Sequence, residues 1–114
     1  MEIERLVKTK KIKAAFAKIK ELEPKTMKRH ISLTEIPSPP FKESKRAAAF
    51  ANHFKELGVD SLWIDSEGNV LGLFKGSREN HTIALDAHLD TVFPEGTDVK
   101  VNIKNDTLFA PGIG

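Results

Sequence analysis

The sequence predicts an α/β fold in which helices come first and strands follow. Apolar residues recur at helical spacing through much of residues 2–57, whereas short apolar runs suited to strands occupy residues 61–110. One of these runs, Ile83-Ala84-Leu85, is wholly apolar, as in a strand buried inside a sheet. This order of elements favours a sheet covered by helices. Few helical patterns follow Gly58, so the predicted domain looks unfinished, because a parallel sheet needs helices on both faces.

Composition restricts the class of protein. With 114 residues the chain is one domain or a piece of one. Apolar residues at 39% and charged residues at 30% are typical of a soluble globular protein, and no stretch is apolar enough to span a membrane. Lysines interrupt every apolar run near the N-terminus, which leaves no signal-peptide core and predicts a cytoplasmic protein. Without cysteine, any metal must be held by histidine and carboxylate.

The net charge of +2 is unevenly distributed. Residues 1–30 carry ten Lys/Arg and four Glu, whereas residues 31–114 carry eight basic and twelve acidic side chains. A basic helix can bind nucleic acid or a membrane surface. Aromatic residues are not interleaved with these lysines, so we expect residues 1–25 to form a basic helical extension with a solvated face. Neither a nucleic-acid nor a membrane partner is expected.

Two helices are predicted before the first proline-rich stretch. Residues 2–22 have apolar side chains at three-to-four spacing, which indicates a helix. Pro24 is expected to open a short second helix that ends by Glu35, since proline suits the first helical position. The sequence Ile36-Pro37-Ser38-Pro39-Pro40 cannot continue a helix, because each proline removes an amide donor and restricts the residue before it. We expect a rigid, extended connector there.

The clearest amphipathic pattern predicts a helix from about Lys42 to Leu57. Its apolar stripe comprises Ala47, Phe50, Ala51, Phe54 and Leu57. Gly58 is well placed to end the helix in the left-handed conformation. The alanines suggest close packing, so the stripe is expected to cover a sheet.

Strands are predicted in the remainder of the chain. Ser61 to Asp65 and Val70 to Lys75 form a hairpin around a turn at residues 66–69. After the loop at residues 76–80, residues 82–87 are expected to form a central, buried strand.

A second pair of strands is predicted beyond the break at Pro94-Glu95-Gly96. Val99 to Ile103 alternate in polarity, and Asn105-Asp106 turn the chain back into Thr107 to Ala110. The last residues, Pro111 to Gly114, are predicted to form a glycine-rich loop. That loop lacks the lysine and hydroxyl residue of a phosphate-binding loop.

Charged side chains follow directly on the predicted central strand. Asp86, His88 and Asp90 come at spacing two, so an extended backbone would point all three to one face. Ligands of open α/β sheets sit at the carboxyl ends of strands, where His88 and Asp90 would fall. An imidazole flanked by carboxylates can bind a metal. Taken alone, however, His88 and Asp90 would more often be a hydrogen-bonded surface pair.

Four motifs occur in the order found in a known family. They are Ile36-Pro37-Ser38-Pro39, Gly68-Asn69-Val70, Asp86 to Pro94, and Leu108 to Gly114. Together they resemble the aminoacylase/carboxypeptidase family of di-zinc hydrolases, over roughly residues 26–114. That family includes glutamate carboxypeptidase, tripeptide aminopeptidase, acetylornithine deacetylase and succinyl-diaminopimelate desuccinylase. The resemblance implies the N-terminal part of a zinc-exopeptidase-like three-layer α/β/α catalytic domain with a mixed sheet.

The resemblance assigns roles to two residues. His88 matches a zinc ligand, and Asp90 matches the catalytic-site carboxylate that accepts the second ring N–H and fixes the tautomer. Asp86 is not part of the motif and has no role. The resemblance implies two zinc ions, with cobalt or manganese as possible substitutes. It also implies a metal-bridging aspartate directly after Gly114, and a general-base glutamate and further ligands downstream.

The function implied by the resemblance is a di-zinc exopeptidase that hydrolyses peptide bonds through a metal-activated water. Residues 1–114 are expected to be inactive alone, because they lack most ligands and the general base. An amidohydrolase of the same family, acting on N-acyl-amino acids, is an open alternative. A non-catalytic fragment or a binding module built on the basic helix is an alternative of another class. A homodimer would form through a lid domain outside these residues.

Overall fold

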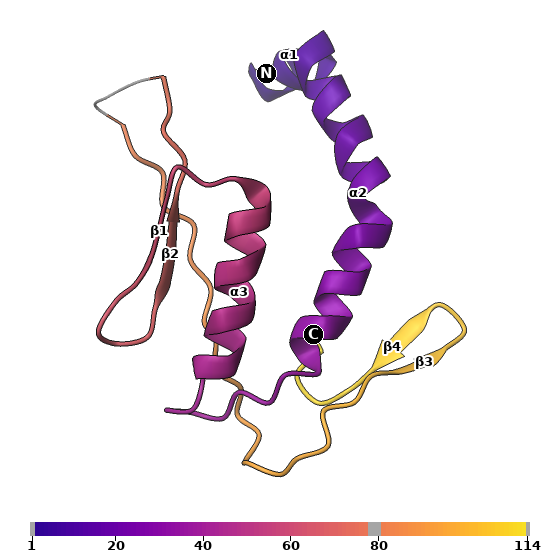
Figure 1. The fold of residues 1–114 in the computed structure, drawn as a ribbon. Coiled ribbons are helices and arrows are strands. Elements are labelled where there is room, and N and C mark those ends of the chain that lie inside the picture. Colours follow the sequence, from indigo (N-terminus) through magenta and orange to yellow (C-terminus); the bar gives the residue numbers. More distant parts are fainter. Residues whose placement is uncertain (1, 78–80, 114) are drawn as a thin grey trace. The chain divides into compact units, whose positions relative to one another are not determined.

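The computed structural model describes residues 2–77 and 81–113. It divides into two units, Met1–Ser32 and Leu33–Gly114, and each is described by itself. Within the described residues the element order is α1, α2, α3, β1, β2, β3 and β4 (Figure 1). Helices are followed by two small antiparallel sheets, so the chain is mixed α/β in the predicted order.

The N-terminal unit is helical but breaks at a different place from the one predicted. Helix α1 spans Glu2–Lys8 and α2 spans Lys10–Thr34, with Pro24 inside α2. Between them, the Thr9 hydroxyl donates to the Leu6 carbonyl at 2.7 Å and accepts from the Ile12 amide at 3.4 Å. Thr9 therefore caps α2, a role that threonine commonly fills.

The prediction that Pro24 opens a new helix is wrong. Proline removes only its own amide donor, and its fixed φ is close to the helical value, so a helix can continue through it at a cost in stability. In contrast, the Thr9 side chain offers the backbone an alternative to the helical hydrogen bond. The helix therefore ends and restarts at the threonine.

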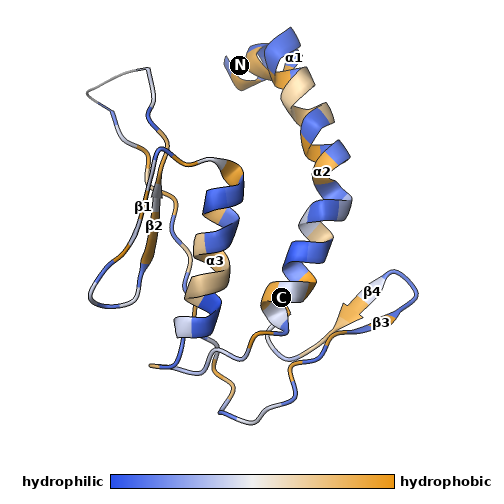
Figure 2. Cartoon of the chain, viewed as in Figure 1, coloured by the Kyte–Doolittle hydropathy of each residue, from blue (hydrophilic) through white to orange (hydrophobic). Residues whose placement is uncertain are grey.

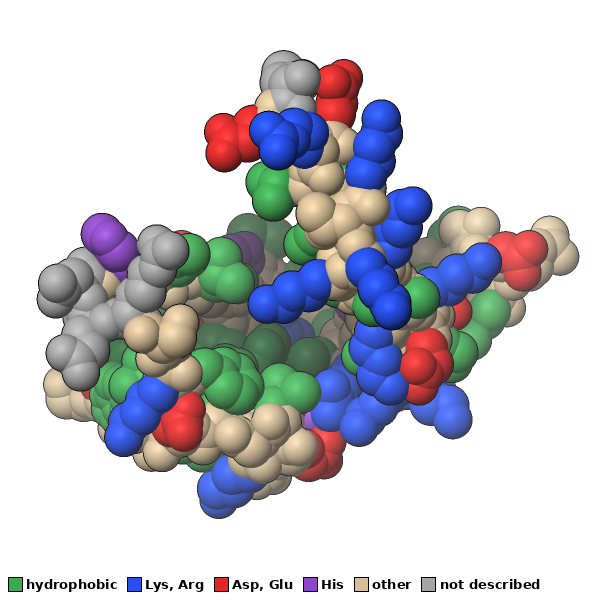
Figure 3. Space-filling model, turned by 90° about the horizontal axis from the view of Figure 1, so that it is seen from above, with side chains coloured by type: hydrophobic (Ala, Val, Ile, Leu, Met, Phe, Trp, Pro, Cys, Tyr) green, Lys and Arg blue, Asp and Glu red, His purple; other side chains and the backbone are tan. Residues whose placement is uncertain are grey.

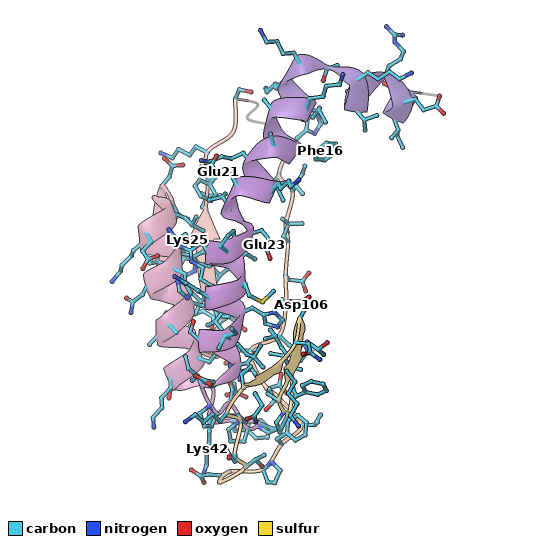
Figure 4. The ribbon with its side chains drawn as sticks, turned by 90° about the vertical axis from the view of Figure 1, so that its right-hand side faces the viewer. Phe16, Glu21, Glu23, Lys25, Lys42 and Asp106 are labelled. Carbon is cyan, nitrogen blue, oxygen red and sulfur yellow. The ribbon has the colours of Figure 1, made fainter. Side chains whose placement is uncertain are left out.

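Polar and apolar residues are mixed along α2 (Figure 2). Many Lys and Arg side chains stand on the surface (Figure 3), and on α2 Lys18 pairs with Glu21 at 2.6 Å. Figure 4 labels Phe16, Glu21 and Lys25 along this helix, where the Phe16 side chain is 55% exposed. Among the described helices, none combines the length and the apolar character needed to cross a membrane.

The second unit contains helix α3 packed on a hairpin, as predicted. Helix α3 spans Ser44–Leu57, and Gly58 ends it with φ of 72° in the left-handed region. Strands β1 (Ser61–Ile64) and β2 (Val70–Leu73) pair antiparallel, with Leu62 opposite Gly72. Helix α3 contacts both strands, and Ala47 at its start is buried. The predicted apolar stripe therefore covers the sheet.

Close packing between α3 and the hairpin depends on Gly72. A Cβ added there would lie 3.0 Å from Cδ2 of Phe54. Phe54 in turn makes an edge-to-face contact with Phe50, with ring centroids 6.4 Å apart. Because Gly72 has no side chain, the Phe54 ring can lie directly on the strand backbone.

The second hairpin also occurs, with shorter strands than predicted. Strand β3 spans Asn102–Lys104 and β4 spans Thr107–Phe109, and they pair antiparallel. Asn105, with φ of 52°, and Asp106 form the turn; Asp106 is labelled in Figure 4. The predicted strand begins at Val99, but this residue precedes β3. It is buried, so its apolar side chain contributes to a core rather than to the ladder.

The central strand predicted at residues 82–87 is not formed. Residues 81–90 have no helix or strand and are drawn as coil in Figure 1. Ile83 is 88% exposed and Leu85 is 95% exposed. A strand needs a neighbour for its backbone hydrogen bonds, and the described strands pair only as β1 with β2 and β3 with β4. The apolar run therefore has neither a ladder partner nor a covering layer among the described residues.

Candidate metal centre

His88 and Asp90, the two residues assigned to the site, are in contact. His88 Nδ1 lies 3.0 Å from Asp90 Oδ1 and 2.8 Å from the backbone oxygen of Asp90. The His88 side chain is 82% exposed and that of Asp90 is 43% exposed. The imidazole is therefore open to solvent on the side away from the aspartate.

This contact determines which ring nitrogen carries the proton. A carbonyl oxygen and an ionised carboxylate both only accept hydrogen bonds. A neutral His88 that makes these bonds therefore carries its proton on Nδ1 and keeps a lone pair on Nε2. This is the form of imidazole that can bind a metal through Nε2.

The pair borders a hollow of about 410 Å³. The His88 segment supplies both polar and apolar lining residues and the C-terminal loop supplies apolar ones; the lining includes His88, Asp90, Phe93, Ala110, Gly112 and Ile113. Gly112 has φ of 73°, and a Cβ added there would lie 3.4 Å from Cε2 of Phe93. That distance is an ordinary van der Waals contact, so the left-handed backbone, rather than a lack of space, favours glycine at the point where the loop meets the segment that follows Asp90. Two of the motifs found in the sequence thus meet at one hollow.

Ser38 of the proline-rich connector holds the backbone on both sides of Asp90. Its hydroxyl donates to the Leu89 carbonyl at 2.8 Å, and its own carbonyl accepts from the Thr91 amide at 2.7 Å. Ser38 is only 1% exposed. The connector and the segment around Asp90 are therefore joined by hydrogen bonds to the backbone from a buried serine.

Arg46 of α3 also contacts this backbone, and sequence reasoning missed it. Its Nη1 donates to the Leu89 carbonyl at 3.0 Å, and its Nη2 donates to the Ile36 carbonyl at 2.6 Å. Burial lowers the pKa of the Arg46 guanidinium, while the charge of Asp90 raises it to a smaller extent. Arg46 directly precedes the buried Ala47 in the sequence, but no local pattern indicates that it contacts Leu89, 43 positions away.

An ion pair also joins the residues just before α3 to the turn that follows the His88 segment. The Lys42 ammonium pairs with the Glu95 carboxylate, and both side chains are largely exposed. The hydrogen bond from Lys42, followed by its charge, holds the pKa of Glu95 below its usual range. Exposed pairs of this kind contribute little to stability, so the part-buried contacts of Ser38 and Arg46 are the main constraints on the segment.

The described residues offer one metal ligand at this place, His88, and not the complete set of ligands that a metal site needs. In residues 2–77 and 81–113 there is no group of three or more His, Asp or Glu side chains that could hold a metal ion. Asp86 lies exposed in the same segment. Zinc takes three or four protein ligands, so His88 would need partners that these residues do not supply.

Comparison with known proteins gives a distant relative. No family model matches the chain. The chain is 29% identical over 97 residues to the uncharacterized protein YqjE of Bacillus subtilis (strain 168). The match covers 79% of this chain and 26% of YqjE, so the chain spans about a quarter of the length of the curated relative it matches.

Proposed function

We propose that the chain carries part of the active site of a di-zinc hydrolase that cleaves peptide bonds. In this proposal His88 Nε2 binds one zinc ion and Asp90 holds the ring. The supporting observation is the contact of His88 Nδ1 with two acceptors of Asp90, which in a neutral ring leaves the lone pair on Nε2, in a side chain that is 82% exposed. When bound, zinc activates water at neutral pH and polarises a carbonyl group.

The remaining ligands and the general base are proposed to come from residues outside 1–114. Two facts support this part of the proposal. The described residues contain one donor group at the site and no cluster of three. The chain also matches only 26% of the length of YqjE. The family resemblance supplies the expected identity of the next ligand, an aspartate directly after Gly114.

A three-layer α/β/α domain is proposed on the basis of exposed apolar surface. In the register of β1 and β2, Trp63 lies opposite Leu71, and both point away from the face that carries Gly72 and α3. Trp63 is 46% exposed and Leu73, on the same face as Leu71, is 39% exposed. Strands that are apolar on both faces are typical of sheets covered on both sides. Residues 82–87 would join such a sheet once neighbouring strands are supplied.

The substrate is proposed to be a peptide, with N-acyl-amino acids as the alternative within the same chemistry. Both reactions hydrolyse an amide bond, and the same metals would serve both. The hollow beside His88 has apolar walls at Phe93 and Ile113, which suit an uncharged portion of a substrate. A cytoplasmic location is proposed, because lysines interrupt the apolar runs near the N-terminus.

The experiment compares the 114-residue chain with the complete parent protein. We expect the chain alone to bind zinc weakly and to hydrolyse neither peptides nor N-acyl-amino acids. The parent should hydrolyse one of the two classes and lose activity to a chelator. In the parent, His88→Ala should abolish activity and remove one zinc ligand. His81→Ala is the matched control, since it removes an exposed imidazole from the same segment.

Asp90 should matter less than His88. Replacing it with alanine leaves the backbone oxygen of residue 90, which already lies 2.8 Å from His88 Nδ1, to accept the ring proton. We therefore expect Asp90→Ala to lower zinc affinity by roughly 10-fold, at the lower end of the range for such partners. Asp86→Ala is its control and should change nothing. Peptidase activity in the isolated chain, or full activity in a His88→Ala parent, would overturn the proposed function.

A further inference from the structure

The peptide that links His88 to Asp90 is held from two other parts of the chain. The Leu89 carbonyl accepts one hydrogen bond from the Ser38 hydroxyl and another from the Arg46 guanidinium. Arg46 uses its second terminal nitrogen on Ile36, in the connector. One side chain of α3 thus bridges the connector and the metal-site segment.

We propose that Arg46 is a positioning residue for the candidate metal ligand: its guanidinium fixes the Leu89 peptide and thereby sets the orientation and tautomer of the His88 ring. The expected effect on zinc rests on the proposed function. The expected effect on the tautomer of His88 does not.

The geometry transmits this constraint through Asp90. Asp90 lies between two anchored backbone groups, the Leu89 carbonyl and the Thr91 amide, which is bound to Ser38. Both acceptors of the His88 ring proton belong to Asp90. Fixing the backbone on each side of Asp90 therefore fixes the two acceptors, and with them the nitrogen of His88 that carries the proton.

The environment of Arg46 is unusual for a side chain with only a packing role. It is partly buried, its terminal nitrogens bond neutral carbonyls, and its Nε is buried without a hydrogen-bond partner among the described residues. Burial of a cation is costly when no carboxylate is directly bonded to it. The planar fork of arginine places two separate nitrogens on two carbonyls, whereas lysine ends in a single nitrogen. The charge of Asp90 is the opposite charge that acts on the guanidinium.

The test is a measurement of the ring nitrogens of His88 by NMR in the 114-residue chain, at a pH where the imidazoles are neutral. The wild-type ring should be mainly in the form protonated on Nδ1. In Arg46→Gln the ratio of this form to the Nε2-protonated form should fall roughly 10-fold, because the Leu89 carbonyl keeps only its bond from Ser38 and the acceptors on Asp90 are held less firmly. His81, exposed in the same segment, serves as the internal reference and should not change.

Two further variants distinguish a positioning effect of Arg46 from an effect of its charge, and a fluorescence measurement checks folding. Lys45→Gln removes a positive charge from the same turn of α3 at an exposed side chain and should leave His88 unchanged. Arg46→Lys keeps the charge but has one nitrogen in place of the two that bond Leu89 and Ile36, so its tautomer ratio should lie between those of wild type and Arg46→Gln. The fluorescence of Trp63, the single tryptophan, reports whether the β1–β2 hairpin stays folded.

In the parent protein, Arg46→Gln should weaken zinc binding by about the same factor as it changes the tautomer ratio. A wild-type ring protonated on Nε2, or a folded Arg46→Gln chain with an unchanged ratio, overturns the positioning role. If Arg46→Gln does not fold, an Arg46→Lys ratio equal to that of wild type overturns it instead. Full activity of His88→Ala would reject the zinc site while leaving the tautomer result intact.

Discussion

The hairpin β1–β2 and the segment at residues 81–90 both contain short apolar runs, but only the hairpin becomes a sheet. Each hairpin strand has the other as its ladder partner, and α3 covers one face. The run at Ile83 and Leu85 has no paired strand among the described residues and is almost fully exposed. An apolar run therefore forms a strand where the chain also supplies its neighbour, and the sequence of the run alone does not decide the outcome.

The largest difference in stability is expected when one apolar side chain is removed from the α3–hairpin contact and one from residues 81–90. Phe54→Ala should lower the free energy of unfolding by roughly 2 kcal/mol, less than for a fully buried phenylalanine, because Phe54 is only partly buried. Leu85→Ala should change it by less than about 0.5 kcal/mol, since the side chain is 95% exposed. Urea unfolding followed by Trp63 fluorescence measures both.

Phe41→Ala is a control of matched residue type, because this phenylalanine is 98% exposed. Its effect should be small beside that of Phe54→Ala. Equal losses from Phe54→Ala and Leu85→Ala would mean that the segment at residues 81–90 is packed after all.

A smaller effect is expected where α3 and the hairpin approach most closely. Gly72→Ala places a Cβ 3.0 Å from the Phe54 ring, so the ring or the strand must move. We expect a loss of about 1 kcal/mol, at the lower end for overpacking, because the aromatic ring lies near a surface and can shift. Gly68→Ala is not a suitable control for Gly72→Ala, because Gly68 has φ of 87° and any other residue there would be strained.

Combining Gly72→Ala with Phe54→Ala tests whether Gly72 acts through the Phe54 ring. Phe54→Ala removes the atoms that the new Cβ would meet, so Gly72→Ala should cost less in that background than in wild type. The same coupling should be absent between Gly72→Ala and Leu85→Ala. Additive losses in the first pair would show that Gly72 does not act through Phe54.

The features predicted correctly from sequence are local. Helix α3 and its cap at Gly58 follow from apolar spacing and one glycine, and both hairpins follow from paired runs around turn residues. The contact between His88 and Asp90 spans two residues, so the spacing placed both on one face. For the same reason, a local hydroxyl such as that of Thr9 could in principle have revealed the helix break.

Apart from the helix break at Thr9, the features missed from sequence are non-local. The contact of Arg46 with Leu89 spans 43 residues, and that of Ser38 with Leu89 spans 51. Neither residue type signals such a partner, since arginine on a helix is usually solvated. The state of residues 82–87 likewise depends on strands elsewhere in the chain. The contact between His88 and Asp90 could thus be predicted, whereas the side chains that hold the backbone around it could not.

The smallest effect concerns the turn that closes the β1–β2 hairpin. The Asp65 carboxylate accepts hydrogen bonds from the amides of Glu67 and Asn69 and from the Asn69 side chain. The Asn69 side-chain bond, followed by its backbone bond, lowers the pKa of Asp65 below the usual 3.8. These bonds favour the ionised form, so the folded hairpin binds the proton less tightly than the unfolded chain does.

The sign of the pH dependence follows from this lowered pKa. The stabilisation is complete above pH 3.8, the usual value in the unfolded chain, and is lost as the pH falls through the lower folded value. Asp65→Asn should therefore be less stable than wild type at neutral pH, and the difference should shrink below pH 3.8. Glu67→Gln, in the same turn, is the matched control, because Glu67 contributes its backbone amide rather than its carboxylate. Urea unfolding by Trp63 fluorescence from neutral pH to about pH 2 measures the difference, and a gap that widens in acid would contradict the assignment.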